Sequence, residues 1–313
     1  MATTEYDVVI IGAGPAGLAA GLYASRARRK TILIEKNVTG GQVAVTAVIE
    51  NYPGIHEVNG FDLGQQMQSQ AEKYGMEMAY AQVQSITPQS DGRHLVKLDN
   101  DDAYMAKAVI VTAGADYVRL GVPGEDRLTG YGVSYCATCD AAFFKDMPTV
   151  VVGGGDSALD EGLFVTRYAS SVTVIHRRDE LRAGAYLQER AFAEPKMNFI
   201  WDTVVEEVNG ESEVESLTLK NLKTGEISTL PTKAMFVFIG HNPNSSFVDG
   251  LLDMDAGNHV IVNEWMDTNV PGIFAAGEIR VNAAKQVITS AGDGATAAIR
   301  ADHYITDHFD AVR

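Results

Sequence analysis

Cysteine is scarce in this chain: 313 residues contain only Cys136 and Cys139. A disulfide-stabilised secreted protein usually carries more cysteines in a shorter chain, so the pair is better explained by redox chemistry in a reducing compartment. Zinc needs about four ligands, and no further cysteine or close histidine completes such a set, so we expect no metal site. Two inert core cysteines remain an alternative, although they would not explain the C-x-x-C spacing or the adjacent Asp140.

Basic side chains are outnumbered by acidic ones. The chain has 25 Lys and Arg against 41 Asp and Glu, which gives a formal net charge of −16 at pH 7. This charge repels phosphate backbones and anionic lipid surfaces, so we expect neither nucleic acid nor a membrane as a partner. We interpret it as a solvated surface, with an acidic docking face as the alternative.

A long apolar run is also missing. The N-terminus has no basic region, and the first apolar run is short and interrupted by glycines. We therefore expect neither a signal peptide nor a membrane span, and a cytoplasmic location follows by default. The length favours two domains of roughly 100–200 residues each.

The clearest motif lies at residues 8–17. An apolar strand at 8–11 runs into GAGPAG, and a helical pattern starts at Pro15. Glycines in such a loop let the backbone approach a pyrophosphate, and the helix N-terminus stabilises its charge. A second strand ends in Glu35, at the distance expected for a ribose hydroxyl contact. We predict a dinucleotide site, with an ordinary strand-to-helix turn as the alternative. The loop glycines are Gly12, Gly14 and Gly17.

A similar unit recurs from residue 149. A strand at 150–152 meets three glycines at 153–155, and a helical pattern follows. The next strand, 172–175, ends in basic residues where the first unit has a carboxylate: His176, Arg177, Arg178 and Arg182. Guanidinium groups pair with a 2′-phosphate, so this site should prefer NADP(H), unless the arginines merely form a solvated turn.

Both units close in the same way. Residues 106–114 and 232–240 each read as a buried strand that ends in glycine, and each follows a hairpin-like stretch with a turn at 100–101 or 224–225. One nucleotide-binding plan is therefore used twice.

The last 69 residues are too short for a third ordinary domain. They contain an expected strand that runs into Glu278 and an expected helix at 285–305. We predict an α/β fold with two Rossmann-like three-layer dinucleotide-binding domains, the second inserted into the first. Residues 1–114 and 245–313 form the first domain, and residues 115–244 form the second.

Nine short segments, in this order and spacing, resemble the low-molecular-weight, NADPH-dependent thioredoxin reductases over almost the whole chain. They are GAGPAG (12–17), GGQ (40–42), ENYPG (50–54), CATCD (136–140), GGGDSA (153–158), HRRDELRA (176–183), GHNPN (240–244), FAAGE (274–278) and KQVITSAGDG (285–294). The resemblance implies FAD in the first domain, NADPH in the inserted one, a homodimer, and thioredoxin as the protein substrate.

The resemblance also assigns cofactor contacts to positions of this sequence. For FAD these are Gly12, Gly14, Pro15, Gly17, Glu35, Gly41, Gln42, Asn51, Gly277, Glu278, Gln286 and Val287. For NADPH they are Gly155, Asp156, Ser157, His176, Arg177, Arg178 and Arg182.

Three positions depart from the pattern of the resembled family. Glu278 stands where aspartate is usual, and its extra methylene must shift the backbone or the contact to the FAD ribityl chain. Lys285 replaces an arginine. Ala141 replaces a glycine, which would restrict the turn after the cysteines if that position needed a positive φ.

A C-x-x-C pair can close a disulfide on a turn or at a helix start. The resemblance implies that electrons pass from NADPH through the flavin to the Cys136–Cys139 disulfide and then to thioredoxin. It makes Cys139 the flavin-side sulfur, Cys136 the attacking sulfur and Asp140 the acid/base. Because one flavin face cannot meet both the disulfide and the nicotinamide, we expect the inserted domain to rotate on linkers near 115–119 and 241–246.

Related flavoproteins are the main alternatives. The flavoprotein of alkyl hydroperoxide reductases carries an additional N-terminal redox module, for which a first strand at Val8 leaves no room. A flavin dithiol oxidase and the ferredoxin-linked relatives would not need the intact segments at 153–158 and 176–183. A reductase of another protein disulfide carrier remains open. A non-catalytic flavin-binding module would need no second nucleotide site.

Overall fold

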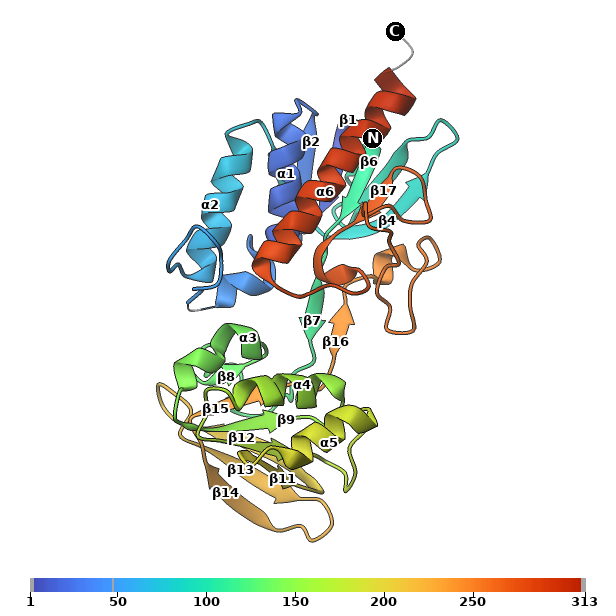
Figure 1. Ribbon diagram of the computed structural model, residues 1–313. Helices are drawn as coiled ribbons and strands as arrows, with labels where there is room; N and C mark the ends of the chain where they lie inside the picture. Colours follow the sequence, from blue (N-terminus) through green and yellow to red (C-terminus); the bar gives the residue numbers. More distant parts are fainter. Residues whose placement is uncertain (1–2, 47, 311–313) are drawn as a thin grey trace. The chain divides into compact units, whose positions relative to one another are not determined.

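The computed structural model describes residues 3–46 and 48–310. The chain forms two compact units, one of Met1–Asp116 with Asn242–Arg313 and the other of Tyr117–His241. It passes between them through strands β7 (Ala115–Tyr117) and β16 (His241–Pro243), which pair as a two-stranded sheet (Figure 1). The second unit is therefore an insertion within the first.

The sheet of the first unit has a parallel core. Its order is β3-β2-β1-β6-β5-β4, and β17 also pairs with β6. Strands β1, β2, β3, β6 and β17 pair in parallel, whereas β4 and β5 are antiparallel additions. The bounds are β1 (Thr4–Ile11), β2 (Thr31–Glu35), β3 (Glu77–Tyr80), β4 (Val83–Pro88), β5 (His94–Leu98), β6 (Ala103–Val111) and β17 (Ile273–Ala275).

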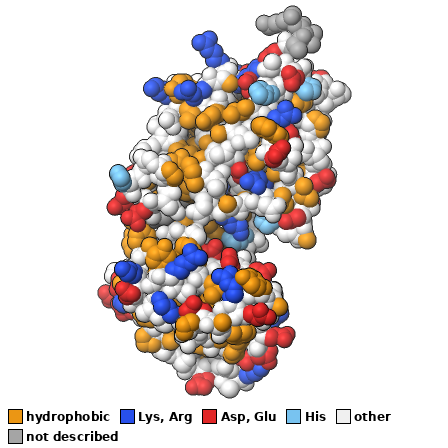
Figure 2. Space-filling model, in the orientation of Figure 1, with side chains coloured by type: hydrophobic (Ala, Val, Ile, Leu, Met, Phe, Trp, Pro, Cys, Tyr) orange, Lys and Arg blue, Asp and Glu red, His pale blue; other side chains and the backbone are white. Residues whose placement is uncertain are grey.

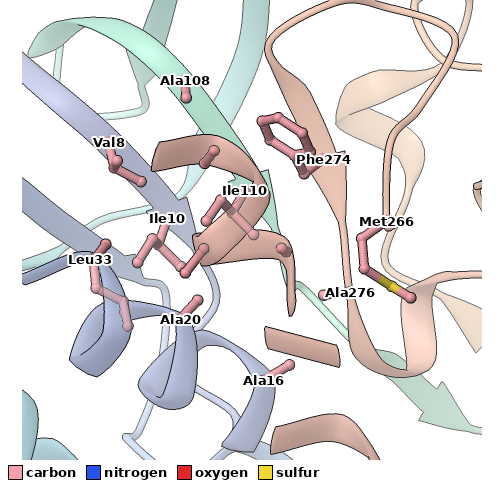
Figure 3. Packing of buried hydrophobic residues seen from close by; sticks show 14 of the residues in the cluster. Val8, Ile10, Ala16, Ala20, Leu33, Ala108, Ile110, Met266, Phe274 and Ala276 are labelled. Atoms are coloured by element: carbon pink, nitrogen blue, oxygen red, sulfur yellow. The ribbon is translucent and has the colours of Figure 1, made fainter. Parts of the chain in front are cut away.

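Side-chain alternation along β1 builds two hydrophobic cores. Val8 and Ile10 pack into the core that contains Leu33, Ile110 and Phe274 (Figure 3). Val9 and Ile11 belong to the opposite core, which also contains side chains of β4 and β5. Because successive strand residues point to opposite faces, the apolar run in the sequence records burial on both sides.

In the described part of the first unit, the α-helices are α1 (Pro15–Arg26), α2 (Gly60–Glu72) and α6 (Val287–Ile305). Helices α1 and α6 lie side by side (Figure 1). The backbones of the two helices approach each other closely at Gly294, where an added Cβ would overlap the carbonyl oxygen of Ala16. Helix α2 is capped by Asn59, whose side chain accepts from the Asp62 N–H at 2.8 Å.

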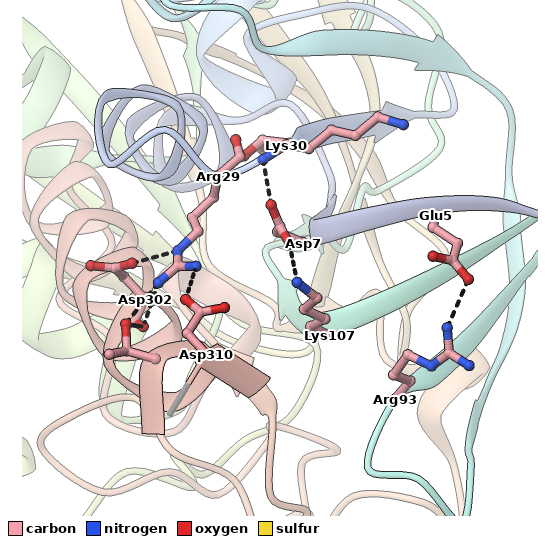
Figure 4. A network of polar contacts seen from close by, with 10 residues as sticks. Glu5, Asp7, Arg29, Lys30, Arg93, Lys107, Asp302 and Asp310 are labelled. Carbon is pink, nitrogen blue, oxygen red and sulfur yellow. Dashed lines mark hydrogen bonds and ion pairs between the residues drawn. The ribbon is translucent and has the colours of Figure 1, made fainter. Parts of the chain in front are cut away.

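A partly buried arginine joins the ends of α1 and α6 (Figure 4). The Arg29 guanidinium donates to Asp302 Oδ1 at 2.6 Å, Asp310 Oδ2 at 2.6 Å and Thr306 Oγ1 at 2.7 Å. Its side chain is only 14% exposed, so these partners offset its desolvation.

The second unit has three layers. Its five parallel strands follow the order β11-β10-β9-β15-β8, helices cover one face, and an antiparallel sheet β12-β13-β14 covers the other. Val151 of β9 packs into the helix-side core, whereas Val150 and Val152 pack toward the three-stranded sheet. The strands are β8 (Val133–Ser134), β9 (Pro148–Val152), β10 (Ser171–Ile175), β11 (Met197–Ile200), β12 (Thr203–Asn209), β13 (Ser216–Asn221), β14 (Ile227–Pro231) and β15 (Ala234–Val237).

Short helices complete both units. The α-helices of the second unit are α3 (Ala137–Asp140), α4 (Asp156–Val165) and α5 (Ala185–Ala193). Single-turn elements are η1 (Gly41–Val45), η2 (Ala141–Phe144), η3 (Ser246–Val248), η4 (Gly277–Ile279) and η5 (Thr306–Asp310). The predicted fold class, two Rossmann-like α/β units with the second inserted into the first, is confirmed.

The surface carries charges of both signs, interspersed with apolar side chains on the face shown in Figure 2. Within the described part of the chain, none of the helices has the length and apolar character needed to span a bilayer.

The close contact of α1 and α6 predicts a position-specific cost on stability. Gly294→Ala should lower the melting temperature by several degrees, because the added methyl meets the Ala16 backbone and overpacking typically costs about 1–3 kcal/mol. Gly292→Ala is the matched control, since a Cβ there meets no atom within 4 Å and alanine favours the helix by about 1 kcal/mol. Thermal unfolding of both variants checks this; equal melting temperatures would contradict it.

Candidate active site

The two cysteines are joined in a disulfide, with their Cα atoms 5.3 Å apart. Cys136 is the N-cap residue of α3 and has an extended backbone, and Cys139 lies in the first turn. The Asp140 N–H donates to the Cys136 carbonyl at 3.2 Å, which closes this turn. The pair therefore lies at a helix start, as C-x-x-C chemistry requires. Across residues 3–46 and 48–310, no three His, Cys, Asp or Glu side chains lie close enough to hold a metal ion.

Asp140 lies beside the disulfide as a partly buried carboxyl group. Burial raises its pKa, and a hydrogen bond from Ser134 works against that rise. The Ser134 Oγ donates to Asp140 Oδ2 at 2.6 Å. Ser134 was assigned no role from the sequence, although it lies only two residues before Cys136 and six before Asp140; the turn of α3 folds Asp140 back onto its hydroxyl.

Ala141 causes no strain in this turn. Its φ is −59° and its ψ is −31°, which is right-handed helical geometry that any L-residue adopts. The position does not need a positive φ, so alanine in place of glycine leaves the turn intact.

The first glycine loop follows β1 directly. Gly12 has φ +107°, and a Cβ on Gly17 would overlap the Gly12 carbonyl oxygen, so the protein itself needs both glycines. Gly14 differs: a Cβ there would meet no protein atom within 4 Å. The open space beside Gly14, next to Pro15 at the start of α1, fits the approach of a pyrophosphate.

Glu35 ends β2 beside this loop. Its two carboxylate oxygens accept from the backbone N–H groups of Ala13 at 2.7 Å and Asn37 at 2.8 Å. The side chain is thereby fixed, and each oxygen keeps a lone pair that could accept from a ribose hydroxyl.

Residues 40–42 lie against the same loop. Gly40 N–H donates to the Ala13 carbonyl at 2.8 Å, and a Cβ on Gly41 would lie 3.4 Å from Gly14 Cα. The Gln42 amide donates to Asp116 Oδ1 at 2.9 Å, so in this structure it binds the end of the first segment of its own unit.

A third segment, 277–287, contributes to the first unit. Gln286 is the N-cap residue of α6, which begins at Val287, and its Oε1 accepts from Asn51 Nδ2 at 3.1 Å. Burial raises the pKa of Glu278, while Lys285 works against that rise. Lys285 has φ +55°, so this turn is left-handed at a non-glycine residue.

Two supporting residues of this site were not predicted. Asp293 accepts from the Gly277 N–H at 3.2 Å and from Arg280 at 2.7 and 2.9 Å, which fixes the loop before Glu278. Thr112 Oγ1 lies 2.8 Å from the Gly12 carbonyl oxygen and holds the first glycine loop. Both residues occur inside segments that the sequence reads only as strand or helix, and their polar roles depend on tertiary contacts.

In the second glycine loop, as in the first, one glycine is required by packing within the protein and another borders open space. A Cβ on Gly154 would overlap the His176 ring, whereas one on Gly155 would meet no protein atom within 4 Å. Asp156 Oδ1 accepts from the Gly184 N–H at 2.7 Å, and Arg182 N–H donates to the Gly154 carbonyl at 2.7 Å. The loop with the arginines is therefore attached to the glycine loop through its backbone. Ser157 is exposed in the first turn of α4.

The three arginines after β10 are exposed. Within the described ranges, Arg177, Arg178 and Arg182 make no side-chain hydrogen bond or ion pair. Burial first, and then the positive charge of these arginines, lowers the pKa of His176, so its imidazole is neutral at pH 7. Free guanidinium groups in a chain of net charge −16 are suited to a phosphate ligand.

Lys223, which was not predicted, pairs with the two carboxylates of this region. Its Nζ lies 2.8 Å from Asp179 Oδ2 and 3.0 Å from Asp202 Oδ2. The hairpin between β13 and β14 thus supplies a cation to Asp179 and Asp202, two of the acidic neighbours of the arginine loop.

The pyridine nucleotide-disulphide oxidoreductase family matches residues 6–296. The chain belongs to this family. This match and the relatives described next confirm the resemblance to thioredoxin reductases that the nine short segments indicated.

Relatives named thioredoxin reductase match over nearly their full length. The Peptoclostridium litorale protein is 46% identical over 97% of this chain and 98% of its own. The Bacillus subtilis protein is 46% identical over 96% of this chain and 95% of its own length. The crystal structure of thioredoxin reductase from Streptococcus pyogenes matches with a TM-score of 0.94 at 43% identity, covering 98% of this chain and all of that one.

The adjacent glycines 154 and 155 predict separable effects. Gly155→Ala should weaken pyridine nucleotide binding at least tenfold with little change in melting temperature, because the methyl enters space that the protein leaves open. Gly154→Ala should instead lower the melting temperature, because its methyl collides with the His176 ring. Nucleotide titration and thermal unfolding separate the two; an unchanged nucleotide affinity in Gly155→Ala would refute the assignment.

Proposed function

We propose that the chain is an NADPH-dependent thioredoxin-disulfide reductase. The observation that carries this proposal is the Cys136–Cys139 disulfide at the start of α3, beside the partly buried Asp140 and in the same unit as the arginine loop. Relatives named thioredoxin reductase, 44–46% identical over at least 96% of the chain, support it.

The two nucleotide sites are assigned to separate domains. Residues 1–114 and 245–313 would hold FAD, through the loops around Gly14, Gly41 and Gln286 and the carboxylate of Glu35. Residues 115–244 would hold NADPH, with Gly155 leaving room for its phosphates and Arg177, Arg178 and Arg182 facing its 2′-phosphate. When bound, NADPH supplies a hydride and FAD passes the electron pair to the disulfide.

The protein's own groups carry the second half of the reaction. Two electrons and two protons convert the Cys136–Cys139 disulfide to a dithiol. Cys136 gives its proton to solvent, its thiolate attacks a thioredoxin sulfur, the thioredoxin S–S bond breaks, and the departing thiolate takes a proton from Asp140. Cys139 next gives its proton to Asp140 and attacks Cys136 in the mixed disulfide; the second thioredoxin sulfur leaves, takes a proton from solvent, and the original bond is restored.

Burial suits Asp140 to this task. A raised pKa keeps a larger fraction of the carboxyl protonated near neutral pH than for an ordinary aspartate, so it can act as an acid. Cys139 is assigned as the flavin-side sulfur, since Cys136 would attack the protein substrate.

A rotation of the inserted domain belongs to the proposal. The chain passes between the units through only two short strands, β7 and β16. Two solved relatives with the same 43% identity match with different TM-scores, 0.94 for Streptococcus pyogenes and 0.65 for the Lactococcus lactis FR conformation. A domain placement that differs between relatives would lower the TM-score without changing the identity.

A homodimer and a cytoplasmic location complete the proposal. Helices α1 and α6 expose Tyr23, Ile288 and Ile299, each at least 40% accessible, which suits a contact between copies of this chain. A cysteine pair that reduces the disulfide of another protein suits a reducing compartment.

The decisive experiment is a steady-state assay with NADPH or NADH and three acceptors: oxygen, a disulfide dye, and the dye with thioredoxin. The proposal expects NADPH oxidation that accelerates when thioredoxin is added. A further sample contains a small dithiol and no nicotinamide; oxygen consumption at the expense of that dithiol would indicate a flavin dithiol oxidase. Dye reduction that thioredoxin does not accelerate would indicate another protein disulfide carrier.

The role of Cys136 predicts a split between the two half-reactions. Cys136→Ser should keep NADPH-dependent bleaching of the flavin at about 450 nm, where flavins absorb, because the nucleotide sites are untouched. It should lose thioredoxin reduction, because no thiolate remains to attack the substrate. Stopped-flow absorbance and a thioredoxin assay measure the two steps. Normal thioredoxin turnover would show that the assignment is wrong.

The arginine loop predicts the nucleotide preference. Replacing Arg177 and Arg178 together with alanine should raise the KM for NADPH by roughly tenfold per arginine, because each loses a charge-assisted contact to the 2′-phosphate. The KM for NADH should change little. Lys145→Ala is a control for general loss of positive charge in the same unit. Equal weakening of both nucleotides would refute the 2′-phosphate assignment.

A further inference from the structure

The hydroxyl of Ser134 lies among three polar groups of the redox turn. Its Oγ is 2.6 Å from Asp140 Oδ2, 3.1 Å from the Cys136 backbone nitrogen and 3.2 Å from the Cys136 carbonyl oxygen. Ser134 is 4% exposed and is the last residue of β8, where it pairs with Phe236 of β15. The sheet therefore fixes the hydroxyl in place beneath the cysteine turn.

In this position the Ser134 hydroxyl can form a hydrogen bond with Asp140 whether that carboxyl is ionised or protonated. A hydroxyl has one proton and two lone pairs, and one lone pair accepts the Cys136 N–H in either state. An ionised Asp140 can only accept, so the Ser134 proton points to it. A protonated Asp140 can donate to the second lone pair, and the Ser134 proton then turns to the Cys136 carbonyl. Neither state leaves a buried polar atom without a partner.

We propose that Ser134 is a positioning residue that satisfies both protonation states of Asp140, so that this carboxyl can give up and regain a proton without moving. The inference rests on the proposed function and names a residue that supports its acid/base. Without Ser134, the ionised state of Asp140 would lose its hydrogen bond at a buried site.

The other charged groups near α3 do not substitute for this hydrogen bond. Helix α4 packs on α3 and carries Asp156, Asp160 and Glu161, and Lys145 follows η2. Strands β9 and β15 carry no ionisable side chain. Burial and the Ser134 hydrogen bond are the two influences on the pKa of Asp140, and only the hydrogen bond favours the ionised form.

The test compares Ser134→Ala with Ser134→Thr, each alone and in an Asp140→Asn background. The Asp140 carboxyl is titrated in the oxidised holoenzyme by infrared difference against Asp140→Asn. Ser134→Ala should raise the pKa of Asp140 by about one unit, a tenfold change in its ionisation, because the ionised form loses a charge-assisted bond. Ser134→Thr keeps a hydroxyl and should leave the titration near that of the parent chain.

The predicted rise in the pKa of Asp140 can also be measured through the pH dependence of the reaction rate. Thioredoxin reduction by the pre-reduced enzyme should decline as pH rises through the pKa of the acid, and this decline should move to higher pH in Ser134→Ala. Asp140→Asn should lack it, and Ser134→Ala should then cause no further shift. If Ser134→Ala does not fold, Ser134→Gly removes the same hydroxyl.

An unchanged carboxyl titration in Ser134→Ala would overturn the inference, as would an equal kinetic shift in the Asp140→Asn background. The proposed function is tested by a different result from the one that tests the role of Ser134. A parent chain that cannot reduce thioredoxin with NADPH would refute that function, while a shifted titration in the oxidised protein would still support the control of Asp140 by Ser134.

Discussion

The sites of both units depend on a close approach of backbone at the point where a buried strand turns into a helix. In the first unit, Gly17 lies directly against the Gly12 carbonyl, and Thr112 holds that carbonyl from β6. In the second, Gly154 leaves just enough room for the His176 ring. A side chain at these glycines would push the helix from the sheet. The helix N-terminus would then no longer face the space beside Gly14 or Gly155, where a phosphate is proposed to bind.

The two units share this constraint and differ in the charge placed next to it. The first unit ends its second strand with Glu35, held by two backbone N–H groups. The second unit ends the equivalent strand with His176 and three exposed arginines, and Lys223 pairs with the nearby carboxylates of Asp179 and Asp202. One architecture can therefore distinguish a ribose hydroxyl from a ribose phosphate through a few residues at a single strand end.

Hydrogen-bonded carboxylates that are buried or partly buried are the second recurring feature. Glu35 accepts backbone N–H groups, Asp293 accepts Arg280 and a backbone N–H, and Asp140 accepts a serine hydroxyl. Two of these sets are rigid, because backbone groups and an arginine only donate to the carboxylate. The serine can donate or accept, and this property suits Asp140 to proton transfer where the other two carboxylates serve as fixed anchors.

The sequence by itself determined the secondary structure and the repeated plan. Apolar runs such as 8–11 and 150–152, followed by glycine loops, are local patterns whose physical meaning does not depend on distant residues. The C-x-x-C spacing likewise allowed a disulfide. Tertiary structure alone decided the partners of the polar groups. Thr112, Asp293 and Lys223 gain their roles from partners that are distant in sequence and that tertiary packing brings within hydrogen-bond reach. Ser134 lies close in sequence to its partners, and it is the exact turn geometry of residues 134–140 that the residue pattern did not reveal. Hydrogen bonds depend on angle and distance to a few tenths of an ångström, and no periodicity in a sequence records that precision.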